Sequence, residues 1–208
     1  MNVVIVDYGM GNIFSIQSAI KYLGVQALFS RDTETILSAH RIILPGVGSF
    51  HQAMKNLNDS GIDEVIKLAA IEKQTPLLGI CLGMELLGNS STEGKFQEGL
   101  GLIDCPVERF NVESDSSTKI PHVGFNTITT KEDSILFQDL PKQIDVYFTH
   151  SYRMAYQEQS FVSSTCFHGE EFVASFEKKN IFGTQFHPEK SQSNGLVILK
   201  NFIDKGGY

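Results

Sequence analysis

A seven-residue segment near the middle of the chain restricts its fold more than any other feature. It reads Leu77-Leu78-Gly79-Ile80-Cys81-Leu82-Gly83. A short, continuous apolar run of this kind is typical of a strand buried on both faces, so we expect a strand over 77–80. A helix is expected to begin just after Cys81, because a sharp strand-to-helix turn exposes its central side chain and needs small neighbours. The segment therefore predicts a sheet covered by helices.

The first half of the chain alternates between strand-like and helix-like segments. Expected strands cover 3–6, 26–29, 41–44 and 77–80, and expected helices cover 13–23, 50–57 and 62–71. This alternation predicts a mostly parallel, open sheet flanked by helices, as in flavodoxin-like α/β folds, with functional groups at the carboxyl ends of the strands.

The second half is richer in strands, which predicts extra antiparallel strands. They are expected around 103–110, 127–130, 145–148, 161–167, 172–176 and 181–185, before a last helix over 196–203. The polar stretch 112–119 is expected to be an exposed loop. No repeat or linker divides the chain, so residues 1–208 are expected to form a single domain.

Charge and composition exclude several classes of protein. The net charge is −7 and the basic residues form no stripe, which argues against nucleic-acid binding. The longest apolar run, 76–87, contains two glycines and Glu85 and is too short to span a membrane. Three cysteines without a CxxC pair, and no secretory leader, predict reduced thiols in a cytoplasmic protein rather than a disulfide frame or a zinc site.

Cys81 is the candidate nucleophile. A helix beginning after it would favour the thiolate, and the backbone N–H of Leu82 would form half of an oxyanion hole. A free cysteine is also among the residues most often buried in a core, so the turn alone leaves both interpretations open.

His187 and Glu189 are the candidate base and its orienting acid. They follow the expected strand 181–185, so His187 should lie at the same sheet edge as Cys81. A histidine can take the thiol proton and return it to a leaving amine, while a carboxylate fixes its tautomer. By itself, such a segment is more often a surface loop.

Pro45-Gly46-Val47-Gly48 follows another expected strand. The N–H group of Val47 or Gly48 could complete the oxyanion hole, and the loss of one such donor typically costs ~3 kcal/mol of transition-state stabilisation. In isolation this segment would be an ordinary turn.

Together these segments resemble the class I, or triad, glutamine amidotransferases. Further matches are similar to the glutaminase subunits of imidazole glycerol phosphate synthases. They are the segments 7–12 (DYGMGN), 121–126 (PHVGFN), 148–152 (FTHSY) and 187–191 (HPEKS), and with the first three segments they cover essentially the whole chain in one order.

The resemblance implies a function, a partner and further site residues. The protein would hydrolyse L-glutamine and pass ammonia to a (β/α)8-barrel cyclase subunit in a heterodimer, for histidine biosynthesis, with no metal or organic cofactor. The residues expected at the glutamine site are Gly46, Glu85, His150, Ser151 and Tyr152. The residues expected to face the cyclase are Asn12, Val123, Phe125, Tyr147 and Lys190.

Two departures from the family pattern leave open which branch of the family this chain resembles and whether it is active. Glu85 stands where the family usually has glutamine, and a carboxylate accepts hydrogen bonds but donates none unless it is protonated. Phe125 replaces the more usual tryptophan, which gives some support to a paralogous branch that supplies ammonia for sugar amidation in surface-polysaccharide synthesis, although histidine biosynthesis ranks first. Two competing hypotheses are a cysteine peptidase on a related fold and a regulatory protein without catalytic activity.

Overall fold

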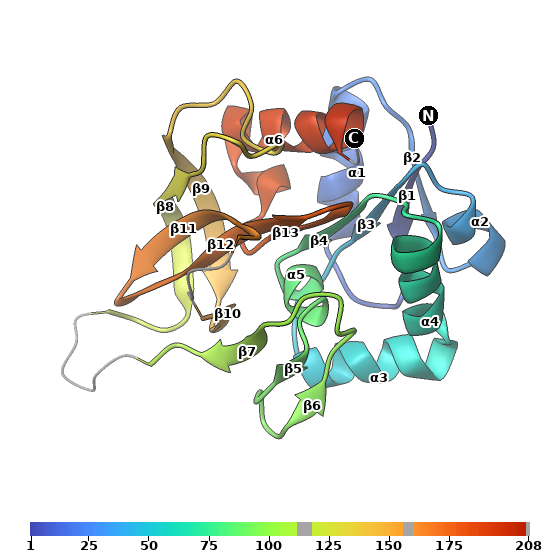
Figure 1. Ribbon diagram of the computed structural model, residues 1–208, viewed down its shortest axis with the longest axis horizontal. Coiled ribbons are helices and arrows are strands. Elements are labelled where there is room, and N and C mark those ends of the chain that lie inside the picture. The colour runs from blue at the N-terminus through green and yellow to red at the C-terminus, as the bar shows by residue number, and fades with distance from the viewer. Residues whose placement is uncertain (112–117, 156–159, 207–208) are drawn as a thin grey trace.

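The computed structural model describes residues 1–111, 118–155 and 160–206. Figure 1 shows a large twisted sheet with helices on both sides and a small sheet below it. Most of the stretch expected to be a loop over 112–119 lies outside the described residues, which resume at Thr118.

The first half alternates strands and helices as its sequence predicts. Its strands are β1 (Val3–Val6), β2 (Ala27–Ser30), β3 (Arg41–Leu44) and β4 (Leu77–Ile80). Its helices are α1 (Ile13–Tyr22), α2 (Thr33–Leu37), α3 (Phe50–Ser60), α4 (Ile62–Lys67), which continues as the π-helix η1 (Leu68–Glu72), and α5 (Leu82–Leu86). The single turn α2 was not expected; it is capped by Asp32, whose carboxylate accepts from Thr35 N.

The second half is mainly strands, several of them longer than expected. They are β5 (Ser90–Ser91), β6 (Gln97–Glu98), β7 (Pro106–Arg109), β8 (His122–Thr130), β9 (Gln143–His150), β10 (Tyr152–Met154), β11 (Val162–His168), β12 (Glu170–Lys178) and β13 (Ile181–Thr184). The 3-10 turn η2 (Pro188–Lys190) and the helix α6 (Gln192–Lys205) complete it.

The strand order places the carboxyl ends of three parallel strands side by side. The large sheet runs β2-β1-β3-β4-β13-β12-β11-β8-β9. Strands β2, β1, β3, β4 and β13 are parallel, and from β12 outward each neighbour is antiparallel. A second sheet, β10-β7-β5-β6, was not expected.

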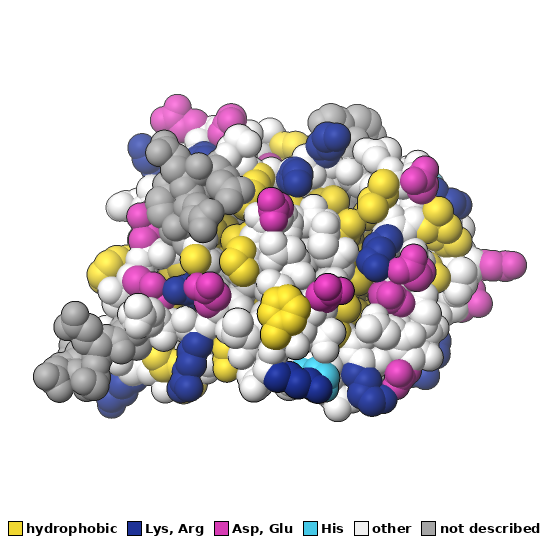
Figure 2. All heavy atoms as spheres, turned by 60° about the horizontal axis from the view of Figure 1, so that its bottom comes forward, with side chains coloured by type: hydrophobic (Ala, Val, Ile, Leu, Met, Phe, Trp, Pro, Cys, Tyr) yellow, Lys and Arg dark blue, Asp and Glu magenta, His cyan; other side chains and the backbone are white. Residues whose placement is uncertain are grey.

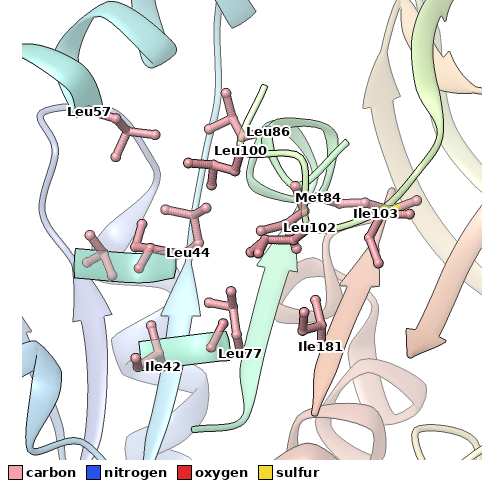
Figure 3. Close-up of a cluster of buried hydrophobic side chains, with 14 of the residues drawn as sticks. Ile42, Leu44, Leu57, Leu77, Met84, Leu86, Leu100, Leu102, Ile103 and Ile181 are labelled. Carbon is pink, nitrogen blue, oxygen red and sulfur yellow. The ribbon is translucent and has the colours of Figure 1, made fainter. Parts of the chain in front are cut away.

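The core lies in two layers, one on each face of the sheet. One layer packs under α2 to α5 and includes Leu44, Leu77, Met84 and Leu86, which are drawn together in Figure 3. The other packs under α1 and α6 and includes Ile5, Ile80, Phe182 and Phe202. This burial on both faces explains the continuous apolar character of β4.

One face of the molecule carries charges of both signs (Figure 2). On the face shown in Figure 2, basic and acidic side chains alternate without a basic stripe among the described residues. No described helix is long and apolar enough to cross a membrane.

Candidate active site

Cys81 occupies a strained turn between β4 and α5. Its φ is +54° and its ψ is −113°, a conformation that residues other than glycine rarely adopt. A Cβ on Gly79 would lie 2.6 Å from Gly83 O, and one on Gly83 would lie 1.9 Å from Leu44 O. Both glycines are therefore required by the close packing of the turn, as the sequence predicts.

The segment after β3 lies directly against this turn. A Cβ on Gly46 would be 2.7 Å from Gly83 N and 2.8 Å from the hydroxyl of Tyr8. That hydroxyl donates to Pro45 O at 2.7 Å, which fastens the start of the segment to the loop after β1. Gly48 has a φ of +104°, and Val47 and Gly48 are both exposed at the site.

His187 and Glu189 form a buried pair beyond β13. The register pairs Thr184 with Ile80, so the two chains leave the sheet at the same edge. His187 Nδ1 lies 2.8 Å from Glu189 Oε1. Because a carboxylate oxygen accepts, Nδ1 carries a proton, and in the neutral ring Nε2 keeps a free lone pair; Nε2 is buried and has no hydrogen-bond partner among the described residues.

The thiol of Cys81 is hydrogen-bonded to a carbonyl rather than to its expected base. It donates weakly to Thr149 O at 3.9 Å, and His187 Nε2 receives no hydrogen bond from it. Burial, followed by the nearby Glu85, raises the pKa of the Cys81 thiol, and the Leu82 N–H only partly opposes this. The N–H at the helix start therefore favours the thiolate as expected, but burial of the thiol outweighs it in this conformation.

A pocket of about 340 Å³ opens over the turn. Eight of the residues expected at the site line it, namely Val47, Gly48, Cys81, Leu82, Glu85, His150, Ser151 and Tyr152, together with Glu93, Pro121 and Thr149. Gly46, His187 and Glu189 do not belong to this lining. The pocket therefore gathers residues from the segment after β3, from α5 and from the β9–β10 corner.

Glu85 is a buried carboxyl with an unusual partner. It is 5% exposed, and its Oε1 accepts from Gln185 Nε2 at 2.8 Å. Burial raises the pKa of Glu85 to about 8, the Gln185 hydrogen bond opposes the rise, and the charge of Glu93 adds to it. Near neutral pH the carboxyl is protonated, so it can donate a hydrogen bond as an amide would.

The sequence analysis missed Pro121, which lines the pocket, and three residues with clear contacts or charge there, Tyr8, Glu93 and Thr149. Tyr8 holds the segment after β3, Glu93 places a carboxylate in the pocket wall, and Thr149 accepts from the thiol. Tyr8 and Thr149 lie within the segments that carry the family resemblance, and this could have marked them. Glu93 lies in a polar stretch without any pattern, and nothing in the sequence marks it.

Four of the five residues expected to face a partner lie on β8, β9 and η2. The Phe125 and Tyr147 rings meet edge-to-face at 5.5 Å between centroids, and Lys190 Nζ lies 5.5 Å from the centre of the Tyr147 ring. Val123, 58% exposed, and Phe125, 52% exposed, point outward from β8. Asn12 lies apart in sequence at the start of α1, which packs against η2.

The described residues contain no group of three His, Cys, Asp or Glu side chains placed to hold a metal ion. Cys81, Cys105 and Cys166 are all free and buried. Burial raises the pKa of Cys105 to about 11 and that of Cys166 to about 12, so both remain thiols.

Comparison with known proteins assigns a family. The model of the family described as glutamine amidotransferase class-I matches residues 4–205. The chain is 41% identical over 206 residues to "Imidazole glycerol phosphate synthase subunit HisH 2" of Nitrobacter winogradskyi, covering 97% of each chain. It is 42% identical over 203 residues to "Imidazole glycerol phosphate synthase subunit HisH" of Geobacter sulfurreducens, covering 96% of this chain and 97% of that one.

Solved structures share the fold at low sequence identity. A structure described as a glutamine amidotransferase superposes with a TM-score of 0.74 at 18% identity, covering 97% of both chains. A chain in the structure of PurLQS from Thermotoga maritima gives a TM-score of 0.73 at 18% identity, covering 98% of this chain and 97% of that one.

Proposed function

We propose that this chain, which belongs to the class I glutamine amidotransferase family, is the glutaminase subunit of an imidazole glycerol phosphate synthase. It hydrolyses L-glutamine to glutamate and ammonia, and the ammonia passes to a cyclase subunit. The observation that carries the chemistry is that Cys81, on its strained turn, and the His187–Glu189 pair follow two paired parallel strands that end at one sheet edge.

Cys81 is the nucleophile in this mechanism, and His187 is its base. Nε2 of His187 takes the thiol proton as the sulfur attacks the side-chain amide of glutamine, forming a C–S bond. Glu189 stabilises the imidazolium through Nδ1. His187 then protonates the leaving nitrogen, the C–N bond breaks and ammonia departs. Water hydrolyses the thioester to glutamate.

The oxyanion is bound by backbone N–H groups on two sides of Cys81. Leu82 N–H lies at the start of α5, and Val47 and Gly48 come from the segment after β3. Glu93 adds negative charge for the ammonium group of free glutamine, and protonated Glu85 donates to the substrate. This acidic wall favours a free amino acid over an amide within a peptide.

The partner is a (β/α)8-barrel cyclase subunit that docks on the surface formed by Val123, Phe125, Tyr147 and Lys190. Paired aromatic rings and a basic side chain beside them are typical of an interface. A sealed contact would keep ammonia neutral and away from bulk water.

Glutamate release tests this proposal. We expect slow release by the isolated protein, strong stimulation by the histidine-pathway cyclase subunit with its nucleotide ligand, and no release by Cys81→Ala. Release by Cys81→Ala near the wild-type rate would contradict the proposed chemistry. If glutamate release does not respond to that cyclase, the glutaminase assignment stands, but the ammonia goes to another acceptor, such as a sugar that becomes amidated.

A further inference from the structure

Three histidines form a group beside the pocket, and only one of them lines it. His122 and His150 are buried at 4% and 6% exposure, and His168 is half-buried. The ring of His122 stacks on that of His168 at 3.9 Å between centroids, and Phe110 packs against all three rings.

The hydrogen bonds of this group determine where each proton lies. His150 Nδ1 is 2.7 Å from Tyr152 O, and a carbonyl only accepts, so Nδ1 carries the proton. In a neutral ring, Nε2 of His150 is then an acceptor. His122 Nδ1, 3.0 Å away, must donate to it.

The same reasoning extends to Asn126 on β8. With its proton on Nδ1, neutral His122 accepts at Nε2, and Asn126 Nδ2 lies 3.2 Å from that atom. Asn126 is itself fixed, because Nδ2 also donates to Phe167 O and Oδ1 accepts from Thr127 N. The hydrogen bonds therefore all run in one direction: Asn126 donates to His122, His122 donates to His150, and His150 donates to Tyr152 O.

Both rings are suited to a neutral state. Burial lowers the pKa of His122 to about 4, and the neighbouring His168 adds to this. Burial lowers the pKa of His150 to about 3; the bond to Tyr152 O opposes the change, while His122, His168 and His187 add to it.

The last of these hydrogen bonds, from His150 to Tyr152 O, fixes one wall of the pocket. The bond from His150 to Tyr152 O closes the corner between β9 and β10, and Thr149, His150, Ser151 and Tyr152 all line the pocket. The other end of this series of hydrogen bonds is anchored in β8, the strand that also carries the exposed Val123 and Phe125.

We propose that His122 is a positioning residue for the glutaminase: as the Nδ1–H tautomer fixed by Asn126, it holds His150, and thereby the Ser151 corner, in the shape that binds glutamine. The role of this corner in binding glutamine rests on the proposed glutaminase activity, whereas the assignment of the histidine tautomers does not. The corner contacts substrate away from the reacting bond, so its displacement weakens glutamine binding more than it slows the chemical step.

The first experiment reads the tautomers directly. Two-bond ¹H–¹⁵N correlation spectra of the ¹⁵N-histidine-labelled full chain at pH 7 should show His122 and His150 as neutral Nδ1–H rings. An Nε2–H tautomer or an imidazolium at either position would overturn the proposal, whatever the activity of the protein.

The second experiment compares two substitutions within one ring stack. His122→Phe leaves His150 Nε2 buried and unpaired, and we expect the KM for glutamine to rise about tenfold with a much smaller change in kcat. His168→Phe keeps a stacked ring and breaks only the bond from His168 Nε2 to Lys119 O, so its KM should stay within about twofold of wild type.

A conservative variant separates positioning from packing. His122→Asn retains a short N–H donor toward His150 and should recover most of the lost affinity, which a purely structural role for the ring would not predict. It also provides the kinetic test if His122→Phe does not fold. An unchanged KM in His122→Phe, or an equal KM rise in His168→Phe, would overturn the proposal even if the wild-type glutaminase is confirmed.

Discussion

At the scale of single residues, Glu85 gives the site an acid where its family usually has an amide. Its carboxyl accepts from Gln185 and forms no other hydrogen bond within the described part of the chain. Burial of a carboxyl with one hydrogen-bond donor and no cation against it favours the protonated form. Its ionisation would add a negative charge beside the Cys81 thiol and remove a donor from the pocket.

This predicts a loss of activity at alkaline pH. Because the pKa of Glu85 is raised to about 8, the acid is protonated below that value and ionised above it, so glutamine turnover should fall as pH rises through about 8. Glu85→Gln cannot ionise and should lack this decline. Profiles of kcat/KM against pH for the two proteins provide the measurement, and parallel profiles would contradict the assignment.

The same carboxyl predicts a pH-dependent stability. The folded state holds the Glu85 proton to about pH 8 and the unfolded state releases it near 4.5, so the folded state binds more protons between these values. Stability contributed by the neutral acid is therefore lost as pH rises through this window, by up to ~1.4 kcal/mol per pH unit. In urea unfolding, Glu85→Gln should gain stability relative to wild type between pH 5 and pH 8. A difference that stays constant over this range would contradict the raised pKa.

Glu189 predicts a graded catalytic defect. Glu189→Gln can still contact His187 Nδ1 but can present an amide N–H instead of an acceptor, so it weakens the tautomer control without removing the nucleophile. We expect its kcat to fall below that of the wild type but to stay roughly 10- to 100-fold above the kcat of Cys81→Ala. Stopped assays of glutamate release would measure both; equal losses would indicate that Glu189 does more than orient the ring.

The sequence predicted chemical groups better than their ionisation. Cys81, Leu82, Val47 and Gly48 were identified because strand ends and glycines mark them. The raised pKa of the Cys81 thiol was not, because it depends on desolvation and on Glu85, and neither can be judged from the order of residues. Glu93 reaches the pocket through a loop between β5 and β6, where no periodic pattern indicates position.

At the scale of elements, α5, β3 and β4 meet too closely for side chains. Gly83→Ala would place a methyl group 1.9 Å from Leu44 O, and we expect the free energy of unfolding to fall by about 3 kcal/mol, with loss of activity as the segment after β3 moves. Gly24→Ala is the control, since its φ of +80° is strained but no atom lies within 4 Å, and it should lose about 1 kcal/mol. If urea unfolding shows similar losses of unfolding free energy for Gly83→Ala and Gly24→Ala, the packing explanation is wrong.

Apolar strands in the middle of the sheet were predictable, and polar or two-residue strands were not. Strands β1, β3 and β4 match their expected bounds because both of their faces are buried. Strands β8 and β9 are longer than expected because they pair with each other over eight residues while presenting polar and exposed side chains. The two-residue strands β5 and β6 exist only through pairing across the chain, and such contacts leave no local pattern.

At the scale of the whole molecule, the proposed nucleophile and its proposed base are not hydrogen-bonded to each other. The Cys81 thiol contacts Thr149 O, and His187 Nε2 is unpaired among the described residues. We therefore expect a docked cyclase with its nucleotide to raise kcat/KM by roughly 5- to 150-fold, the range of common coupling energies. Phe125→Ala, which removes an exposed ring from the docking surface, should weaken this stimulation and leave the unstimulated rate unchanged. A fully active isolated protein would contradict this expectation.

That residues 1–208 form a single domain also remains a prediction.

The position of β13 has a consequence for how the chain is made. This strand is near the end of the sequence, yet it lies in the middle of the large sheet, between β4 and β12. Until residues 181–184 leave the ribosome, β4 and β12 are unpaired apolar edges, which favour wrong association between nascent chains. The strand that joins the two halves also leads into His187, while its neighbour β4 leads into Cys81. In the proposed chemistry, completion of the sheet therefore also brings the base His187 to the edge that holds Cys81, so a half-folded nascent chain would carry a thiol without its base.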